Sequence, residues 1–94
     1  MAQQLSSDLR VLVVVPAFNE QGKIGLVVTK IPKKICTGIF VVDDCSTDAT
    51  AAEAKSAGAI VISHQANRGV GAAIRTGIDY AIRNNFDVVV IMSG

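Results

Sequence analysis

Residues 40–50 decide the fold of this chain, and they read Phe-Val-Val-Asp-Asp-Cys-Ser-Thr-Asp-Ala-Thr. The run from Ile39 to Val42 is β-branched or aromatic without polar alternation, which is typical of a strand covered on both faces in a parallel sheet. The run stops at Asp43 and Asp44, and residues that favour helix starts follow. Two adjacent carboxylates repel each other, so donors from a ligand or a nearby cation are expected to compensate them. The pair predicts a ligand site, with a simple helix cap as the alternative.

The same alternation of strand and helix runs along the whole chain. Pro16 should end the first strand because proline cannot donate to a central ladder. Short connections between alternating strands and helices favour right-handed crossovers and a parallel sheet. The predicted fold class is therefore α/β, with three layers (α/β/α) around a mainly parallel sheet. The expected strands are 9–15, 39–43, 59–63 and 87–91, and the expected helices run from about 21 to 31, from 49 to 57 and from 70 to the Asn84-Asn85 pair.

Three polar clusters follow the first three strands, at residues 16–20, 43–48 and 67–71. Open α/β sheets bind ligands at the carboxyl ends of their strands, so these clusters should meet at one edge. Residues 67–71, Asn-Arg-Gly-Val-Gly, should offer free backbone N–H groups, close approach at two glycines and the positive end of a helix dipole. That combination suits a phosphate, and Arg68 is the better candidate for a diphosphate contact. The alternative is an asparagine cap with glycines for packing.

Composition limits the class of protein. A net charge of +1 argues against nucleic-acid binding, and the one positive cluster, Lys30, Lys33 and Lys34, is interpreted as a solvated helix end. The first ten residues lack the apolar core of a signal peptide, and no apolar run approaches the ~18 residues that span a bilayer. We therefore expect a cytoplasmic chain.

The cysteines and the histidine favour structural interpretations. Cys36 and Cys45 flank the second strand, so they should be too far apart for a disulfide and should remain free thiols. No His or Cys has zinc-finger spacing. His64 is a lone histidine at the end of an expected strand, which favours a structural role. No nucleophile with an adjacent base is evident, so covalent catalysis finds no support.

Two related folds are disfavoured by the position of the motifs. A dinucleotide-binding domain needs its glycine-rich turn after the first strand, where this chain has Pro-Ala-Phe-Asn-Glu at residues 16–20. A receiver domain would need a phospho-acceptor after a strand where none is present.

Taken together, residues 13–20, 41–50 and 67–77 resemble three motifs of the family-two inverting glycosyltransferases of the GT-A fold, in that family's order and spacing. The closest resemblance is to the N-terminal part of the dolichyl-phosphate mannose or glucose synthase branch. It implies a GDP- or UDP-linked sugar as donor. The substrate-binding residues implied are Pro16, Ala17, Phe18 and Glu20 around the base and ribose, Asp43 and Asp44 hydrogen-bonding them, and Asn67, Arg68, Gly69 and Gly71 near the ribose and diphosphate.

Two departures from the family pattern affect these expectations. Many members carry a lysine where this chain has Val70, and the family's Asp-x-Asp metal motif would be expected directly after Gly94. Residues 1–94 are therefore expected to be the N-terminal nucleotide-sugar-binding part of the domain, truncated before the metal motif. The resemblance places Mg²⁺ or Mn²⁺ in the full-length enzyme, with none bound by these residues and no sugar transfer by them alone.

The branch also suggests a polyprenyl phosphate acceptor at a membrane and membrane association of the full-length protein. The last strand should leave an uncovered face and edge, which favours self-association. The alternative from another class is a non-catalytic nucleotide-binding α/β module. A sugar-phosphate nucleotidyltransferase would need a glycine-rich loop after the first strand, and this chain has none there.

Overall fold

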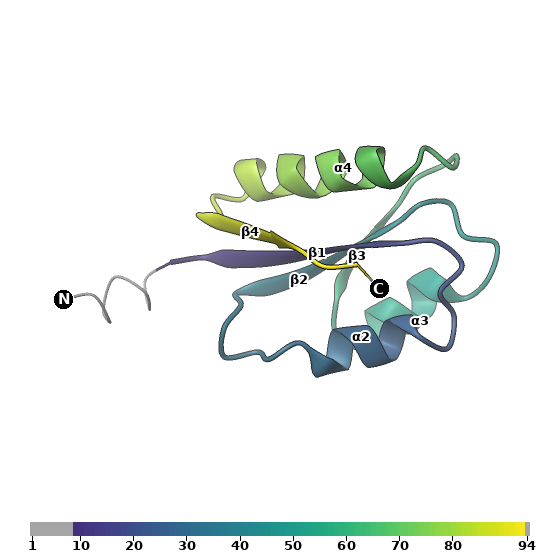
Figure 1. The fold of residues 1–94 in the computed structure, drawn as a ribbon, viewed down its shortest axis with the longest axis horizontal. Coiled ribbons are helices and arrows are strands. Elements are labelled where there is room, and N and C mark those ends of the chain that lie inside the picture. The colour runs from purple at the N-terminus through teal and green to yellow at the C-terminus, as the bar shows by residue number, and fades with distance from the viewer. Residues whose placement is uncertain (1–8, 94) are drawn as a thin grey trace.

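The computed structural model describes residues 9–93, which form a parallel sheet with strand order β3-β2-β1-β4 (Figure 1). Helix α4 covers one face of the sheet, and helices α2 and α3 cover the other. The α/β class and its three layers are thereby confirmed. The strands are β1 (Val11–Ala17), β2 (Gly38–Asp43), β3 (Ile60–Ser63) and β4 (Val88–Ile91), and the helices are α2 (Ile24–Lys30), α3 (Thr50–Ser56) and α4 (Val70–Arg83).

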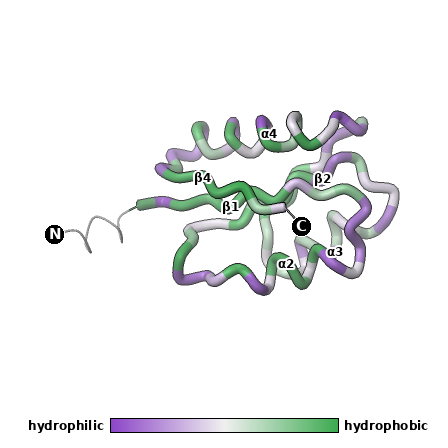
Figure 2. Tube along the Cα trace, viewed as in Figure 1, coloured by the Kyte–Doolittle hydropathy of each residue, from purple (hydrophilic) through white to green (hydrophobic). Residues whose placement is uncertain are grey.

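The apolar runs of β1 and β2 are continuous because both strands are central and face two helical layers. Val13 and Val15 pack in the core under α2 and α3, whereas Leu12 and Val14 pack in the core under α4. Phe40, fully buried in the second core, stacks on Tyr80 of α4 with ring centroids 4.2 Å apart. Figure 2 shows the resulting concentration of hydrophobic residues in the central strands.

Pro16 does not end β1, contrary to expectation, because the strand continues to Ala17. The backbone of Ala17 faces β2, since its carbonyl accepts the Asp44 N–H at 2.8 Å. The backbone groups of the preceding residue therefore face β4, where pairing with β1 ends at the level of Val14 and Ile91. The Met92 N–H donates to the Val14 carbonyl at 2.9 Å, and the next bond of this ladder would need an N–H on Pro16. The proline therefore ends the pairing with β4, while β1 continues beside β2 to Ala17.

Helix α2 begins at Ile24, later than the expected start near Gln21. Asn19 and Gly22 have positive φ values of 51° and 87°, so the intervening residues form turns. The carboxylate of Glu53 on α3 accepts the N–H groups of Gly22 and Gly25, both at 2.8 Å. A side chain from another helix therefore satisfies backbone donors at the start of α2.

The two edge strands are partly exposed. Val90 and Ile91 of β4 are 42% and 40% exposed, and Ile60 and Ile62 of β3 are 43% and 44% exposed. The expectation of an uncovered last strand is met within residues 9–93. Figure 1 shows β4 at the edge of the sheet, beside β1 and below α4.

Candidate functional site

Two of the three polar clusters form one hydrogen-bonded unit at the carboxyl ends of β1 and β2. The Asn19 N–H donates to Ser46 Oγ at 2.9 Å, and Asn19 Oδ1 accepts the Thr47 N–H at 2.9 Å. Farther along, the Glu20 N–H donates to Thr50 Oγ1 at 2.8 Å. Asp48 accepts the Thr50 N–H and hydroxyl, and these bonds hold the pKa of Asp48 below its usual value. The first loop is therefore held in place by the second.

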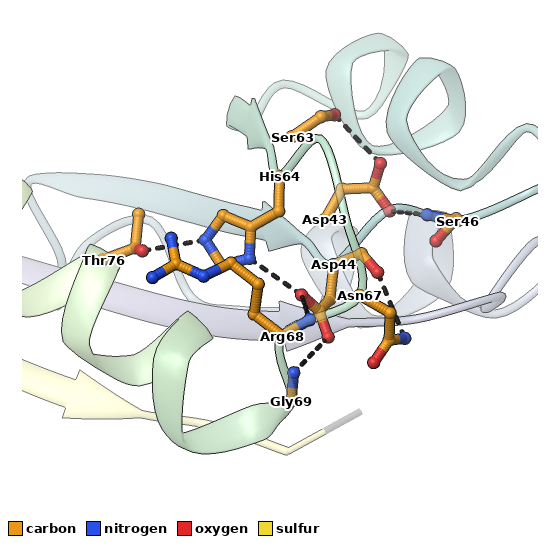
Figure 3. A network of polar contacts seen from close by, with 9 residues as sticks. All are labelled: Asp43, Asp44, Ser46, Ser63, His64, Asn67, Arg68, Gly69 and Thr76. Carbon is orange, nitrogen blue, oxygen red and sulfur yellow. Dashed lines mark hydrogen bonds and ion pairs between the residues drawn. The ribbon is translucent and has the colours of Figure 1, made fainter.

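Asp43 is buried, and its side chain faces the neighbouring strand. Its Oδ1 accepts the Ser46 N–H at 3.2 Å, and its Oδ2 accepts the Ser63 hydroxyl at 2.9 Å. Figure 3 shows these contacts on the opposite side of the chain from those of Asp44. Asp43 therefore stabilises the loop after β2 and its junction with β3.

Asp44 is the centre of the site, because its carboxylate joins β2 to the start of α4 (Figure 3). Its Oδ1 accepts the Arg68 N–H at 2.9 Å, and its Oδ2 accepts the Gly69 N–H at 2.8 Å. The His64 ring nitrogen Nδ1 lies 2.8 Å from Asp44 Oδ1. Burial raises the pKa of Asp44, but the Arg68 N–H, the His64 ring and the Gly69 N–H together outweigh burial and leave this pKa below its usual value.

His64 has a partner that its sequence neighbourhood does not reveal. Its Nδ1 faces Asp44, its Nε2 lies 2.8 Å from the Thr76 hydroxyl of α4, and its backbone N–H donates to the Asp43 carbonyl at 2.8 Å. Asp44 is twenty residues away in sequence, but β2 and β3 are adjacent parallel strands with Asp43 opposite Ser63. The residues that follow the two strands therefore meet at one edge. Pairing of β2 with β3 in this register is the feature that predicts the contact between Asp44 and His64.

A pocket of about 290 Å³ lies at this edge, between the end of β1, the end of β4 and the start of α4. Ile91 and Ser93 line the pocket although they were not among the expected site residues. Their position after the fourth strand, at the same carboxyl edge as the first loop, is a signal for this role. Residues of α4 supply an apolar wall. The pocket is lined by Pro16, Ala17, Phe18, Glu20, Asp44, Val70, Ala73, Ile74, Ile91 and Ser93.

Five of the ten substrate-binding residues expected from sequence line this pocket, and five do not. Those that do not are Asp43, Asn67, Arg68, Gly69 and Gly71. The Asn67 side-chain amide contacts the Asp44 carbonyl at 3.4 Å. Arg68 lines a second hollow of about 300 Å³ along α4, with Ala72, Arg75, Thr76 and Asp79. Around Gly71, a Cβ would meet nothing within 4 Å.

The expectation that residues 67–71 offer free amides is wrong for two of them. The N–H groups of Arg68 and Gly69 are donated to the Asp44 carboxylate. An ionised carboxylate at the start of a helix is stabilised by the same donors and dipole that would attract a phosphate. The Asp44 carboxylate therefore occupies the position at which the sequence motif predicts a bound phosphate.

The adjacent carboxylates of Asp43 and Asp44 do not fit a divalent cation. All four oxygens of Asp43 and Asp44 accept N–H or O–H donors, or face the His64 ring. Within residues 9–93, no group of three or more His, Cys, Asp or Glu side chains could hold a metal ion. The pair therefore acts as an acceptor of protein hydrogen bonds.

Comparison with known families gives a match over residues 12–92 to the model described as glycosyl transferase family 2. The chain belongs to this family. The match begins one residue after the start of β1, and it includes the rest of the sheet and the pocket lining up to Ile91. The site described above therefore lies within the part of the chain that matches family two.

Two curated relatives of this family-two chain are similar over most of its length. An uncharacterized protein of Methanocaldococcus jannaschii is 47% identical over 72 residues, which are 77% of this chain and 30% of the relative. The polyprenol monophosphomannose synthase of Mycolicibacterium smegmatis is 33% identical over 91 residues, which are 88% of this chain and 34% of the relative. The chain thus spans about a third of the length of these relatives.

Solved structures support the same fold. A glucosyl-3-phosphoglycerate synthase from Mycobacterium tuberculosis, in complex with Mn²⁺, UDP and glucosyl-3-phosphoglycerate, superposes with a TM-score of 0.75 at 25% identity, over 96% of this chain and 35% of that chain. A mannosyl-3-phosphoglycerate synthase from Rubrobacter xylanophilus gives a TM-score of 0.58 at 33% identity, over 65% of this chain and 20% of that chain. The fold is therefore that of the GT-A glycosyltransferases.

The part of the chain that the structure describes contains three helices, the longest of which has 14 residues. None of its helices combines the length and the apolar character that crossing a bilayer requires.

Proposed function

We propose that this chain forms the nucleotide-binding part of a glycosyltransferase that uses a nucleotide-diphospho-sugar donor. The observation that carries the proposal is the pocket at the carboxyl ends of β1 and β4, because Pro16, Phe18 and Asp44 line it together. Its volume of about 290 Å³ is at the lower end of the range of small-molecule sites. The position also agrees with the general rule for ligand sites in α/β sheets.

The pocket offers both stacking and hydrogen bonding to a nucleoside. The Phe18 side chain lines the pocket and is 46% exposed, so its ring is available to stack on a base. Asp44 accepts three N–H donors, while an ionised carboxylate has about four acceptor sites. One acceptor site therefore remains for a base N–H or a ribose hydroxyl, and Glu20 supplies a second carboxylate to the lining.

The donor phosphates would lie toward the start of α4, on the side of Gly71. A side chain at Gly71 would meet no neighbour, so the backbone there is open to close approach. The Arg68 side chain lines the second hollow, beside Thr76, so its guanidinium would have to turn toward Gly71 to neutralise part of the diphosphate charge. This assignment moves the diphosphate away from the Arg68 and Gly69 amides, which Asp44 already occupies.

The sugar and the acceptor belong to the whole protein, of which we propose residues 1–94 to be the nucleotide-binding third. The names polyprenol monophosphomannose synthase and glucosyl-3-phosphoglycerate synthase describe products that contain both a sugar and a phosphate group. We propose an inverting transfer to a phosphate-bearing acceptor, with polyprenyl phosphate at a membrane as one candidate. A divalent cation would stabilise the leaving diphosphate, and its ligands would be carboxylates that residues 9–93 do not supply.

Calorimetry with UDP, GDP and their sugar conjugates tests the proposal. Phe18→Ala and Asp44→Asn should each weaken nucleotide binding by at least about 1 kcal/mol, which is about fivefold in Kd. Asp79→Asn is the matched control, because Asp79 is an exposed helix residue that does not line this pocket. Unchanged affinity in both pocket variants would remove the pocket from nucleotide binding. Binding without transfer by a longer protein that supplies metal ligands would favour a non-catalytic module.

A further inference from the structure

His64 occupies a position that the proposed function leaves unexplained. Its side chain is 6% exposed and lies between Asp44 and Thr76, where it bridges the end of β3 and the second turn of α4 (Figure 3). His64 does not line the nucleotide pocket, whereas its partner Asp44 does. The imidazole therefore does not reach the pocket itself. Any influence of His64 on nucleotide binding must act through its contact with Asp44.

The chemistry of the two ring contacts assigns the protons. An ionised carboxylate only accepts hydrogen bonds, so the contact at 2.8 Å requires a hydrogen on Nδ1. In the neutral ring, Nε2 then accepts the hydroxyl hydrogen of Thr76, also at 2.8 Å. In the protonated ring, Nε2 donates to the same hydroxyl oxygen. The chain from Asp44 through His64 to Thr76 is satisfied in both charge states.

This chain fixes the orientation of the Asp44 carboxylate. Oδ1 accepts hydrogen bonds from the His64 ring and the Arg68 N–H, and Oδ2 accepts the Gly69 N–H, so the carboxylate is held against the two amides that directly precede α4. The same imidazole contacts Thr76, six residues into that helix. Helix α4 is thus attached to the β2 and β3 ends at two points, and Val70 and Ala73 between them form part of the pocket wall.

We propose that His64 is a positioning residue for nucleotide binding, in which its Nδ1–H orients Asp44 and thereby holds the start of α4 at the pocket. The proposal rests on the proposed function, because the nucleotide is the ligand that Asp44 would contact. In this proposal the hydrogen-bond donor at Nδ1, and not the volume of the ring, is the property of His64 that matters for nucleotide binding.

Two substitutions distinguish the donor from the ring volume. His64→Asn places a side-chain amide near the position of Nδ1 and retains a donor toward Asp44, whereas His64→Leu fills much of the space without a donor. Both lose the contact to Thr76. Thr76→Val removes that contact alone while keeping a similar shape. We expect nucleotide Kd to rise about tenfold or more in His64→Leu, and about threefold or less in His64→Asn and Thr76→Val.

Amide hydrogen exchange measures the positioning without any nucleotide. The Arg68 and Gly69 amides should exchange faster in His64→Leu than in His64→Asn, while amides of the central β1 and β2 strands remain equally protected. A wild-type protein that binds no nucleotide would remove the proposed function, and the exchange comparison would then still decide whether His64 positions the start of α4.

The proposal is overturned in either of two ways. One is equal nucleotide affinity in folded His64→Leu and His64→Asn, which would show that only ring volume matters. The other is loss of affinity of about tenfold or more in a folded His64→Asn variant, which would show that a donor at Nδ1 is insufficient. If His64→Leu does not fold, the affinity of His64→Asn together with its Arg68 and Gly69 exchange rates decides the proposal.

Discussion

Gly77 of α4 lies directly against Val14 of β1, so close that a Cβ on Gly77 would be 2.3 Å from Val14 Cγ1. Val14 belongs to a central strand and is fully buried, so it cannot move aside without disturbing the core. This contact sets the distance between α4 and the sheet, and therefore the position of the helix that forms the pocket wall.

Gly77→Ala should lower the free energy of unfolding by about 1–3 kcal/mol, because the added methyl group overpacks the core. The matched control is Gly71→Ala in the same helix, where a Cβ meets nothing within 4 Å. Alanine is the better helix former, so Gly71→Ala should be neutral or stabilising by up to about 1 kcal/mol. Denaturant unfolding of the two variants measures the difference, and equal stabilities would contradict the close packing of α4.

Acid should remove the stability that Asp44 contributes. Its pKa in the folded protein lies below the ordinary value of 3.8, so the unfolded chain takes up its proton first as the pH falls. The contribution is complete above the ordinary value and is lost as the pH falls through the lower folded-state pKa. Asp44→Asn should therefore be less stable than wild type at neutral pH, with the gap narrowing below about pH 4.

Urea unfolding at a series of pH values measures this gap. Asp79→Asn is the control, since Asp79 is exposed and forms only a surface pair with Arg83 at 3.1 Å. A wild-type minus Asp44→Asn difference that stays constant from neutral pH to pH 2 would show that the Asp44 hydrogen bonds do not favour its ionised form.

Glu53→Gln should destabilise the start of α2. The two carboxylate oxygens each accept one N–H, from Gly22 and Gly25, and an amide replaces one acceptor with a donor that opposes an N–H. We expect a loss of about 1–2 kcal/mol in the free energy of unfolding. Lys55→Gln, at an exposed position of the same helix, should change stability by less than about 0.5 kcal/mol. Similar effects of the two substitutions would contradict the cap.

Cys36 and Cys45 should stay reduced in air. Both are free thiols, and strand β2 lies between them, so their Cα atoms are separated by far more than the ~7 Å that a disulfide tolerates. The protein is exposed to air, denatured without a reductant, alkylated and weighed by intact mass spectrometry. The mass should then correspond to two alkylated thiols. An intramolecular disulfide would be incompatible with the β1–β2–β3 sheet.

Nucleotide binding by this chain should respond little to Mg²⁺ or Mn²⁺. The Asp43 and Asp44 oxygens already serve protein donors, so a cation would have to displace several hydrogen bonds. Calorimetry with and without metal should give Kd values within about twofold. A large gain in affinity with Mn²⁺ that is lost in Asp43→Asn or Asp44→Asn would reassign the pair to metal binding.

Some of this protein was determined by the sequence alone. The unbroken apolar runs around Val13 and Val41 predict central parallel strands, because only a strand covered on both faces can dispense with polar alternation. Helical periodicity from Val70 onward predicts α4, and the polar residues after the strands predict an edge with a site. These features depend on the pattern of apolar and polar residues within one short segment, so the sequence of that segment suffices to predict them.

Other features were decided only by the tertiary structure. Pro16 stays within its strand because β1 pairs with β2 up to Ala17, beyond the point where its pairing with β4 ends. The first loop bends at Asn19, whose N–H and side chain bind Ser46 and Thr47. The Asp44 carboxylate binds the Arg68 and Gly69 amides, which the sequence motif predicts to bind a phosphate. His64 contacts Asp44, which is twenty residues away in sequence. Each depends on the register of neighbouring strands, which brings together residues whose separation in sequence carries no sign of their contact.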